Sequence, residues 1–239
     1  MSEKTLVELT DAQKALAEIG FDFDEEVQSL TVESNGLDLP RVRVEHRDSE
    51  RHILYVDQGA SYLDDESMGI KIPGNRLVAT VIHEQAIRAL WTKNEPRPTC
   101  AGISNTPITS EPVSESCHNC PEAAIGTGNC KPKIKLIILA EIEGKVQPLI
   151  FNLSPTSIKH WNTHKKKLQK SGLPVIAVNT VFTIEPVSKN GYKWGEVHVG
   201  VSGICSKEML QLAKQARTEL EQITRLISQS DFSDPGDKF

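Results

Sequence analysis

Four cysteines lie within 31 residues of one another near the middle of this 239-residue chain, at Cys100, Cys117, Cys120 and Cys130. The segment around them, residues 96–133, is rich in Pro, Ser, Thr, Asn and Gly and has few apolar residues. A segment of this composition buries too little apolar surface to hold one shape by itself. We therefore expect a Zn2+ ion bound by all four cysteines.

The spacing within the cluster is typical of a closed zinc site. Two residues separate Cys117 from Cys120, so both thiolates can reach one tetrahedral ion. Four thiolates leave no open position for water, so we expect a structural zinc and no enzymatic activity. A site in which His118 replaces one cysteine is a minor variant, and four unrelated buried cysteines are the alternative without a metal. Cys205, outside the cluster, is expected to be a small buried or helix-end residue.

The sequence also indicates a compartment. No apolar run approaches the roughly 20 residues that a bilayer span requires. The N-terminal residues lack the apolar stretch of a secretory signal. We expect a cytoplasmic protein whose thiols stay reduced and form no disulfide framework.

Charge is distributed unevenly along the chain, which has a net charge of −5. Residues 1–60 contain 14 acidic and 6 basic residues. Residues 131–200 contain 11 lysines and four glutamates, with no arginine or aspartate. A strongly basic segment within an acidic protein favours a surface that binds a polyanion. A lysine-rich face that is only solvated, with no partner, would give the same distribution of charge.

The order of predicted elements favours a mainly β (α+β) fold with an OB-fold-like five-stranded barrel, a zinc-binding insertion, a β-rich N-terminal extension and a long C-terminal helix. Alternation of apolar residues predicts the strands, and a Ser-Pro start and a glycine stop predict the helix between the third and fourth strands. The predicted strands are residues 76–89, 134–142, 146–153, 175–184 and 192–201, and the helix extends from Ser154 to about Lys170.

Four regions follow from this assignment. Residues 1–75 are expected to form an α/β extension packed on the core, and residues 76–204 the OB-like core with the zinc insertion at 96–133. Apolar residues spaced by three and four predict a helix over residues 205–229. Residues 230–239 are acidic, contain Pro-Gly and are expected to be disordered.

Basic and aromatic residues occur together around the predicted barrel. Lys131, Lys133 and Lys135 alternate along one strand, so their ammonium groups are expected on one face. Trp161 lies on the lysine-rich helix, where both base stacking and core packing are possible roles. The residues expected to contact nucleic acid are Arg88, Trp91, Lys93, Lys131, Lys133, Lys135, Trp161, Lys165, Lys166, Tyr192, Lys193 and Trp194.

This combination of residues predicts sequence-independent binding of single-stranded DNA. Lysines neutralise phosphates, and aromatic rings stack on exposed bases at about 1–3 kcal/mol per base. The lack of arginine in residues 131–200 argues against bidentate reading of guanine in a major groove. The residues leave open whether DNA or RNA is preferred.

On these residues the chain resembles phage-type single-stranded DNA-binding proteins, in which a zinc subdomain is built into an OB-fold and an acidic tail follows. The resemblance is one of architecture over residues 76–239, and four cysteines here replace a ligand set that includes a histidine. The resemblance implies a role in replication, recombination or repair in a bacterial cell or a phage-infected host, and self-association as a further property. The terminal segment is also similar to the acidic tails of bacterial single-stranded DNA-binding proteins, which implies protein partners bound through Asp231, Phe232, Asp234, Asp237 and Phe239.

Two other functions fit parts of the sequence. One is a zinc-containing adaptor or regulator of a nucleic-acid-processing complex, with the C-terminal helix as its interface. The other is a nuclease that uses a run of carboxylates as metal ligands, namely Asp57, Asp64, Asp65 and Glu66.

Overall fold

The computed structural model describes residues 39–47, 51–57, 69–91, 98–124, 127–189 and 191–220. The chain divides into two compact units, and every described residue belongs to the unit made of Leu39–Gly59 and Met68–Phe239. The other unit, Met1–Asp38 with Ala60–Ser67, lies outside the described residues, and so does most of the predicted N-terminal extension.

The described residues form one ten-stranded sheet with two α-helices. The strands are β1 (Arg41–Arg47), β2 (Arg51–Asp57), β3 (Ile70–Lys71), β4 (Arg76–Leu90), β5 (Cys100–Ile103), β6 (Thr106–Pro107), β7 (Lys131–Ile142), β8 (Lys145–Leu153), β9 (Val178–Lys189) and β10 (Tyr192–Ile204). The helices are α3 (Ile158–Lys170) and α4 (Lys207–Leu220), with 3-10 turns η1 (Pro73–Asn75), η2 (Pro121–Ala123) and η3 (Val175–Ala177).

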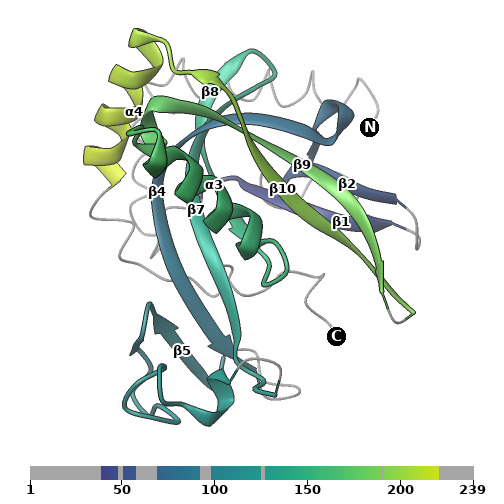
Figure 1. Ribbon diagram of the computed structural model, residues 1–239, viewed down its shortest axis with the longest axis vertical. Coiled ribbons are helices and arrows are strands. Elements are labelled where there is room, and N and C mark those ends of the chain that lie inside the picture. Colours follow the sequence, from purple (N-terminus) through teal and green to yellow (C-terminus); the bar gives the residue numbers. More distant parts are fainter. Residues whose placement is uncertain are drawn as a thin grey trace, which may run out of the picture. The chain divides into compact units, whose positions relative to one another are not determined.

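Eight strands follow one path through the sheet, in the order β10-β9-β4-β7-β8-β1-β2-β3. Strand β4 is 15 residues long, and its first residues pair with β9 while Ile87 to Leu90 pair with β5. Strand β7 pairs with β4 from Ala79 to Ala89. The long β4–β7 pair therefore carries β5 and β6 at the end away from β9, as Figure 1 shows.

Alternating side chains give the sheet two apolar faces. One face contains Leu136, Ile138, Phe151 and Phe182, and Trp161 of α3 packs among them. The opposite face contains Ile82, Ile137, Leu139 and Ile150, and α4 covers it through residues that include Ala213 and Leu220. The two helices therefore pack on opposite faces of the sheet.

The predicted five-stranded barrel is wrong. All five of its strands are present, but β8 pairs with β1 rather than with β10, so the strands continue into a curled open sheet. Helix α3 covers the edge of β10, where the backbone N–H of Val197 donates to Ser157 Oγ at 2.9 Å. In a closed barrel a neighbouring strand would accept the hydrogen bond from this backbone N–H. Here Ser157 accepts it instead, so the edge of β10 is covered without barrel closure.

The predicted long C-terminal helix is also not seen. Helix α4 is 14 residues long and ends at Leu220, and residues 221–229 lie outside the described residues. Met209, Ala213, Ala216 and Leu220 pack on the sheet, whereas Leu212 is 41% exposed. The spacing of apolar residues predicted the packed stripe of α4, apart from the exposed Leu212.

Candidate functional site

The four clustered cysteines line one pocket, although they come from separate segments. Cys100 begins β5, Cys117 and Cys120 precede η2, and Cys130 precedes β7. Backbone hydrogen bonds fix the connecting loops, because the N–H of Cys117 donates to Asn105 O and the N–H of Cys130 donates to Glu122 O. We call residues 98–124 and 127–130 the cysteine module.

Close packing in the cysteine module depends on a glycine. A Cβ atom at Gly102 would lie 2.7 Å from Cys117 Sγ, which is closer than real Cβ atoms approach another atom. The absence of a side chain at Gly102 therefore leaves room for the Cys117 sulfur beside β5.

The cysteines are of the residue type that binds zinc, and they line one pocket. Burial, followed by the neighbouring Cys100, raises the pKa of Cys117, with Arg88 opposing. Burial also raises the pKa of Cys130 to about 11. Thiols held together with raised pKa values are protonated at neutral pH, and a bound dication would displace their protons.

The sulfur atoms are more widely spaced than zinc requires. Tetrahedral Zn–S bonds of about 2.3 Å place sulfurs about 3.8 Å apart. Among the described residues, the ligand atoms that all lie within 4.8 Å of one another belong to His160, Glu196 and His198, and the cysteine sulfurs do not meet this limit. Zinc binding would have to draw the four thiolates closer together.

Two of the predicted nucleic-acid contacts, Arg88 and Trp91, lie at the end of β4 next to the cysteine module. The Arg88 guanidinium donates to the backbone carbonyl of Ala123 at 3.3 Å. Burial raises the pKa of Cys130, and the positive charge of Arg88 partly opposes that increase. Trp91 is half-buried and packs against a small cluster that includes Ile87. The third residue of this group, Lys93, lies outside the described residues.

The three alternating lysines of β7 differ in exposure. They share a face, as predicted, because Lys131, Lys133 and Lys135 pair with alternate residues of β4. Lys131 is exposed, but Lys133 and Lys135 are each only 4% exposed. Alternation therefore placed the three lysines on one face correctly, but it does not show which face is covered, and Lys133 and Lys135 are buried on theirs.

Trp161 is a core residue, with 0% of its surface exposed. The buried side chains of α3 are Trp161, His164 and Leu168, which lie on one side of the helix. Its neighbour Lys165 forms an ion pair with Glu84 of β4, with Nζ and Oε1 2.5 Å apart. Of the two roles open for Trp161 in the sequence, the structure shows core packing.

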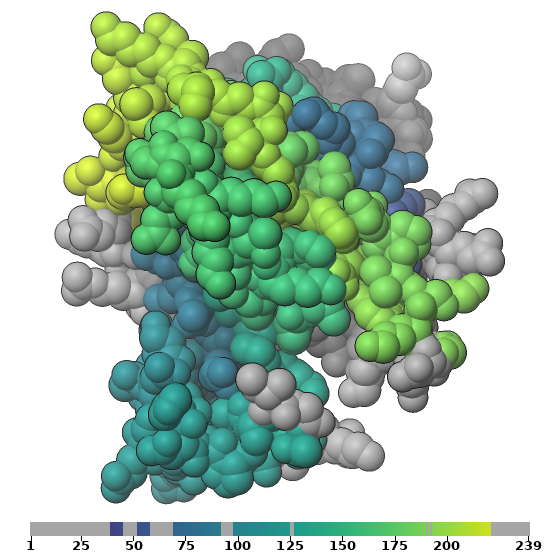
Figure 2. All heavy atoms as spheres, in the orientation of Figure 1, coloured from purple at the N-terminus to yellow at the C-terminus, as the bar shows by residue number. Residues whose placement is uncertain are grey.

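The exposed residues of α3 form a basic surface. They comprise Lys159, Asn162, Thr163, Lys166, Lys167, Gln169 and Lys170. The helix contains no acidic residue. Figure 2 shows α3, in green, at the surface in the same view as the teal cysteine module. We call the four exposed lysines of this helix, Lys159, Lys166, Lys167 and Lys170, the α3 basic face. Of these four, Lys166 was predicted from the sequence as a nucleic-acid contact.

The ribbon of β9 and β10 lies beside this helix. Lys193 is exposed, and Trp194 is half-buried with its indole Nε1 covered. The side chain of Tyr192 lies outside the described residues. Of the three residues predicted here, Lys193 is therefore exposed and Trp194 is partly exposed.

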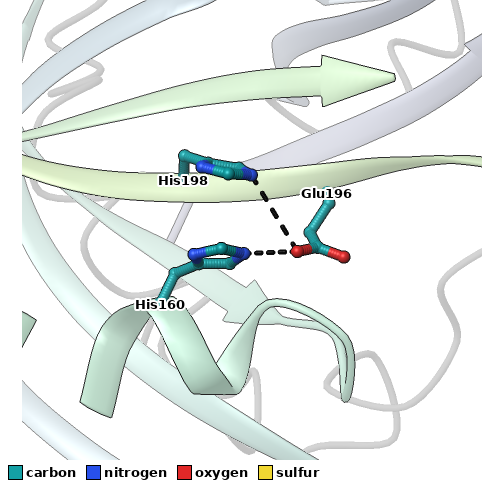
Figure 3. A group of neighbouring side chains, drawn as sticks. All are labelled: His160, Glu196 and His198. Atoms are coloured by element: carbon teal, nitrogen blue, oxygen red, sulfur yellow. Dashed lines mark hydrogen bonds and ion pairs between the residues drawn. The ribbon is translucent and has the colours of Figure 1, made fainter. Parts of the chain in front are cut away.

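A second cluster, which the sequence analysis missed, lies where α3 meets β10. Glu196, with 5% of its side chain exposed, accepts hydrogen bonds through Oε1 from Lys159 Nζ at 2.7 Å and from His160 Nε2. His198 Nε2 lies 3.9 Å from the same oxygen, as Figure 3 shows. The two imidazole rings stack with centroids 3.8 Å apart. The Glu-x-His spacing on a predicted strand was the available signal, but His160 is 36 residues earlier.

The charged partners of Glu196 predict acid sensitivity. Burial by itself raises the pKa of Glu196, but hydrogen bonds and charges from Lys159 and His160 outweigh it and lower the pKa. This stabilisation is fully present above the unfolded pKa of about 4.3 and is lost as pH falls through the lower folded value. Glu196→Gln should cost about 1.5–3 kcal/mol of unfolding free energy at pH 7.

Urea unfolding at several pH values measures this difference. The gap between wild type and Glu196→Gln should close as the pH falls below about 4. Glu141→Gln, which changes an exposed carboxylate on β7, is the control and should show little difference at any pH. A gap for Glu196→Gln that stays constant down to pH 3 would contradict the assigned ion pairs.

The remaining predicted sites are only partly described. Asp57 forms an ion pair with Arg43 at 2.7 Å, so it is already engaged with a cation. Asp64, Asp65 and Glu66, and the terminal residues 231–239, lie outside the described residues. Cys205 is half-buried beside Thr80, with the sulfur 3.3 Å from Oγ1, and lies just before α4.

Comparisons with family models, with curated proteins and with solved structures give no match for this chain. None of the helices in the described part of the chain is long and apolar enough to cross a membrane.

Proposed function

We propose that this protein binds single-stranded DNA without reading its sequence, through a surface centred on the α3 basic face. The observation that carries the proposal is that four of the exposed residues of α3 are lysines and none is acidic. Because the whole chain has a net charge of −5, this local cation set contrasts with the rest of the protein. Such a surface favours a polyanion through counterion release.

The lysine spacing suits an extended strand. Lys159, Lys166 and Lys170 are separated by seven and four residues, so they lie along one stripe of the helix. At 1.5 Å per residue this stripe is about 16 Å long. Lysines bind phosphates as point charges, without the bidentate fork by which arginine reads guanine, so sequence-independent binding is expected.

The β9–β10 ribbon supports single strands over duplex. It contacts α3 through His160 and Glu196, and Trp194 on β10 is only half-buried. Unpaired bases can stack on the exposed part of an aromatic ring, whereas paired bases cannot reach it.

The cysteine module has a bracing role in this proposal. Glu84 contacts α3 through Lys165, and Arg88 contacts the module, and both lie on β4 four residues apart. That separation is about 13 Å along a strand, on one face of the strand. Zinc bound by the four cysteines would hold the module next to the DNA path. As in the phage-type proteins that the sequence resembles, the acidic terminal segment would recruit replication or recombination proteins.

Fluorescence anisotropy of labelled oligo-dT tests the proposal. Binding should be tight at low salt, should weaken steeply as salt rises, and should exceed binding to a duplex of equal length. No binding to oligo-dT at low salt would overturn the proposal. Equal binding to the duplex would overturn its single-strand specificity and favour the adaptor or regulator.

A further inference from the structure

We propose that His160, Glu196 and His198 form a second metal site, which takes a divalent transition ion of the zinc class. The site is separate from the cysteines and adjoins the α3 basic face at Lys159, whose ammonium bonds to Glu196 Oε1, and the proposed DNA binding does not require it. Its three ligand atoms all lie within 4.8 Å of one another. Tetrahedral ligands about 2.0 Å from a zinc ion are about 3.3 Å apart, so small side-chain movements suffice to admit an ion.

Two ordered elements present the ligands. Glu196 and His198 are two residues apart on β10, so they project from the same face of the strand. His160 lies in the first turn of α3, whose start is fixed to β10 by the hydrogen bond from Val197 N to Ser157 Oγ. As Figure 3 shows, both imidazoles turn Nε2 toward the same carboxylate.

The chemistry of the donors selects the class of ion. Two imidazoles with a carboxylate suit Zn2+, Co2+, Ni2+ or Cu2+, whereas Mg2+ and Ca2+ require sets of oxygen ligands. Glu185 supplies a fourth donor, because its Oε2 lies 3.4 Å from His198 Nε2 and its side chain is 61% exposed. Two carboxylates and two neutral imidazoles would balance the charge of a dication.

An ion can enter the cluster from solvent. The side chains of His160 and His198 are 24% and 31% exposed. The Lys159 ammonium, which bonds to Glu196 Oε1, is on a side chain that is 66% exposed and can move away. His160 would release the proton that it shares with Glu196, as metal binding to imidazole requires.

Cobalt titration of full-length protein loaded with a single equivalent of zinc, which the four cysteines hold, tests the site. With the cysteines occupied by zinc, wild type should bind one further Co2+ whose spectrum lacks thiolate-to-cobalt charge transfer. His198→Ala, which leaves the hydrogen bond between His160 and Glu196 in place, should weaken this binding by at least about 100-fold, the upper end of the effect of outer-shell changes. Glu141→Gln is the control and should bind as wild type does.

Three outcomes would overturn the inference. They are failure of zinc-loaded wild type to bind Co2+, equal affinity in His198→Ala, and Mg2+ competing with Co2+ at equal concentration. Because oligo-dT binding does not enter this test, failure of the metal site and failure of the proposed function are distinguishable.

Discussion

Cys117→Ser should remove zinc from the cysteine module and unfold residues 98–130 without unfolding the sheet. Structural zinc contributes apparent binding energies of about 10–16 kcal/mol in small zinc modules, and this module has few apolar residues to replace it. Cys117 Sγ is buried against Gly102, so a serine hydroxyl there offers a weaker ligand in an apolar pocket. Metal content should fall by one zinc per chain, and proteolysis should cut within the module.

The effect on DNA should be indirect. Oligo-dT binding should weaken because the module no longer braces the end of β4, while the lysines of α3 remain in place. Cys205→Ser, which changes the cysteine outside the module, should retain zinc and DNA binding. A Cys117→Ser protein that kept a full equivalent of zinc would contradict the four-cysteine site, and one that lost zinc yet bound DNA normally would contradict the bracing role.

Trp161→Ala should lower the unfolding free energy by about 3–5 kcal/mol, the usual cost of removing a large buried aromatic side chain. Trp161 is fully buried in the same apolar cluster as Phe151 and Phe182, and its ring lies 5.5 Å from that of His164. The cavity left by the indole would loosen α3 from the sheet and uncover the edge of β10. Urea unfolding followed by circular dichroism measures the loss.

Trp161→Phe is the matched control, because it keeps an aromatic ring in the core and should cost less than the alanine variant. At temperatures where both variants are folded, both should still bind oligo-dT. A Trp161→Ala protein of wild-type stability that failed to bind DNA would contradict the core assignment and restore a stacking role for this residue.

Local patterns in the sequence predicted most of the individual elements. Alternation identified β4, β7, β8 and β10, because each strand buries one or both faces. The end of α3 was predicted from Gly172, which has a positive φ of 68°. These features depend on neighbouring residues, so a single sequence contains the information.

The connections between distant segments were not predictable in this way. Strand β8 pairs with β1 through only two residue pairs, Arg41 with Ile150 and Val42 with Phe151, more than 100 residues apart. This parallel pairing keeps the sheet open, and no local pattern in residues 76–204 indicates it. The same limit applies to the burial of Lys133 and Lys135, because a strand pattern separates two faces without showing which one is solvated.

The candidate sites divide in the same way. The cysteine spacing predicted that four side chains share a site, and they line one pocket. The contact among His160, Glu196 and His198 arises because α3 covers the β10 edge, which the barrel prediction did not contain. The lysines of α3 appear in the sequence as a run of positive charge. Which of them share an exposed surface became clear only once the buried side of the helix was known.

The salt dependence of oligo-dT binding tests the central claim most directly. Lys166→Gln, Lys167→Gln and Lys170→Gln in one protein should weaken binding and reduce the slope of log K against log salt by about 2, since each lost phosphate contact contributes about 0.7 for single strands. A control protein with Lys145→Gln, Lys207→Gln and Lys214→Gln loses the same charge from exposed positions outside α3 and should keep the wild-type slope. Equal slopes in all three proteins would contradict DNA binding by the α3 basic face.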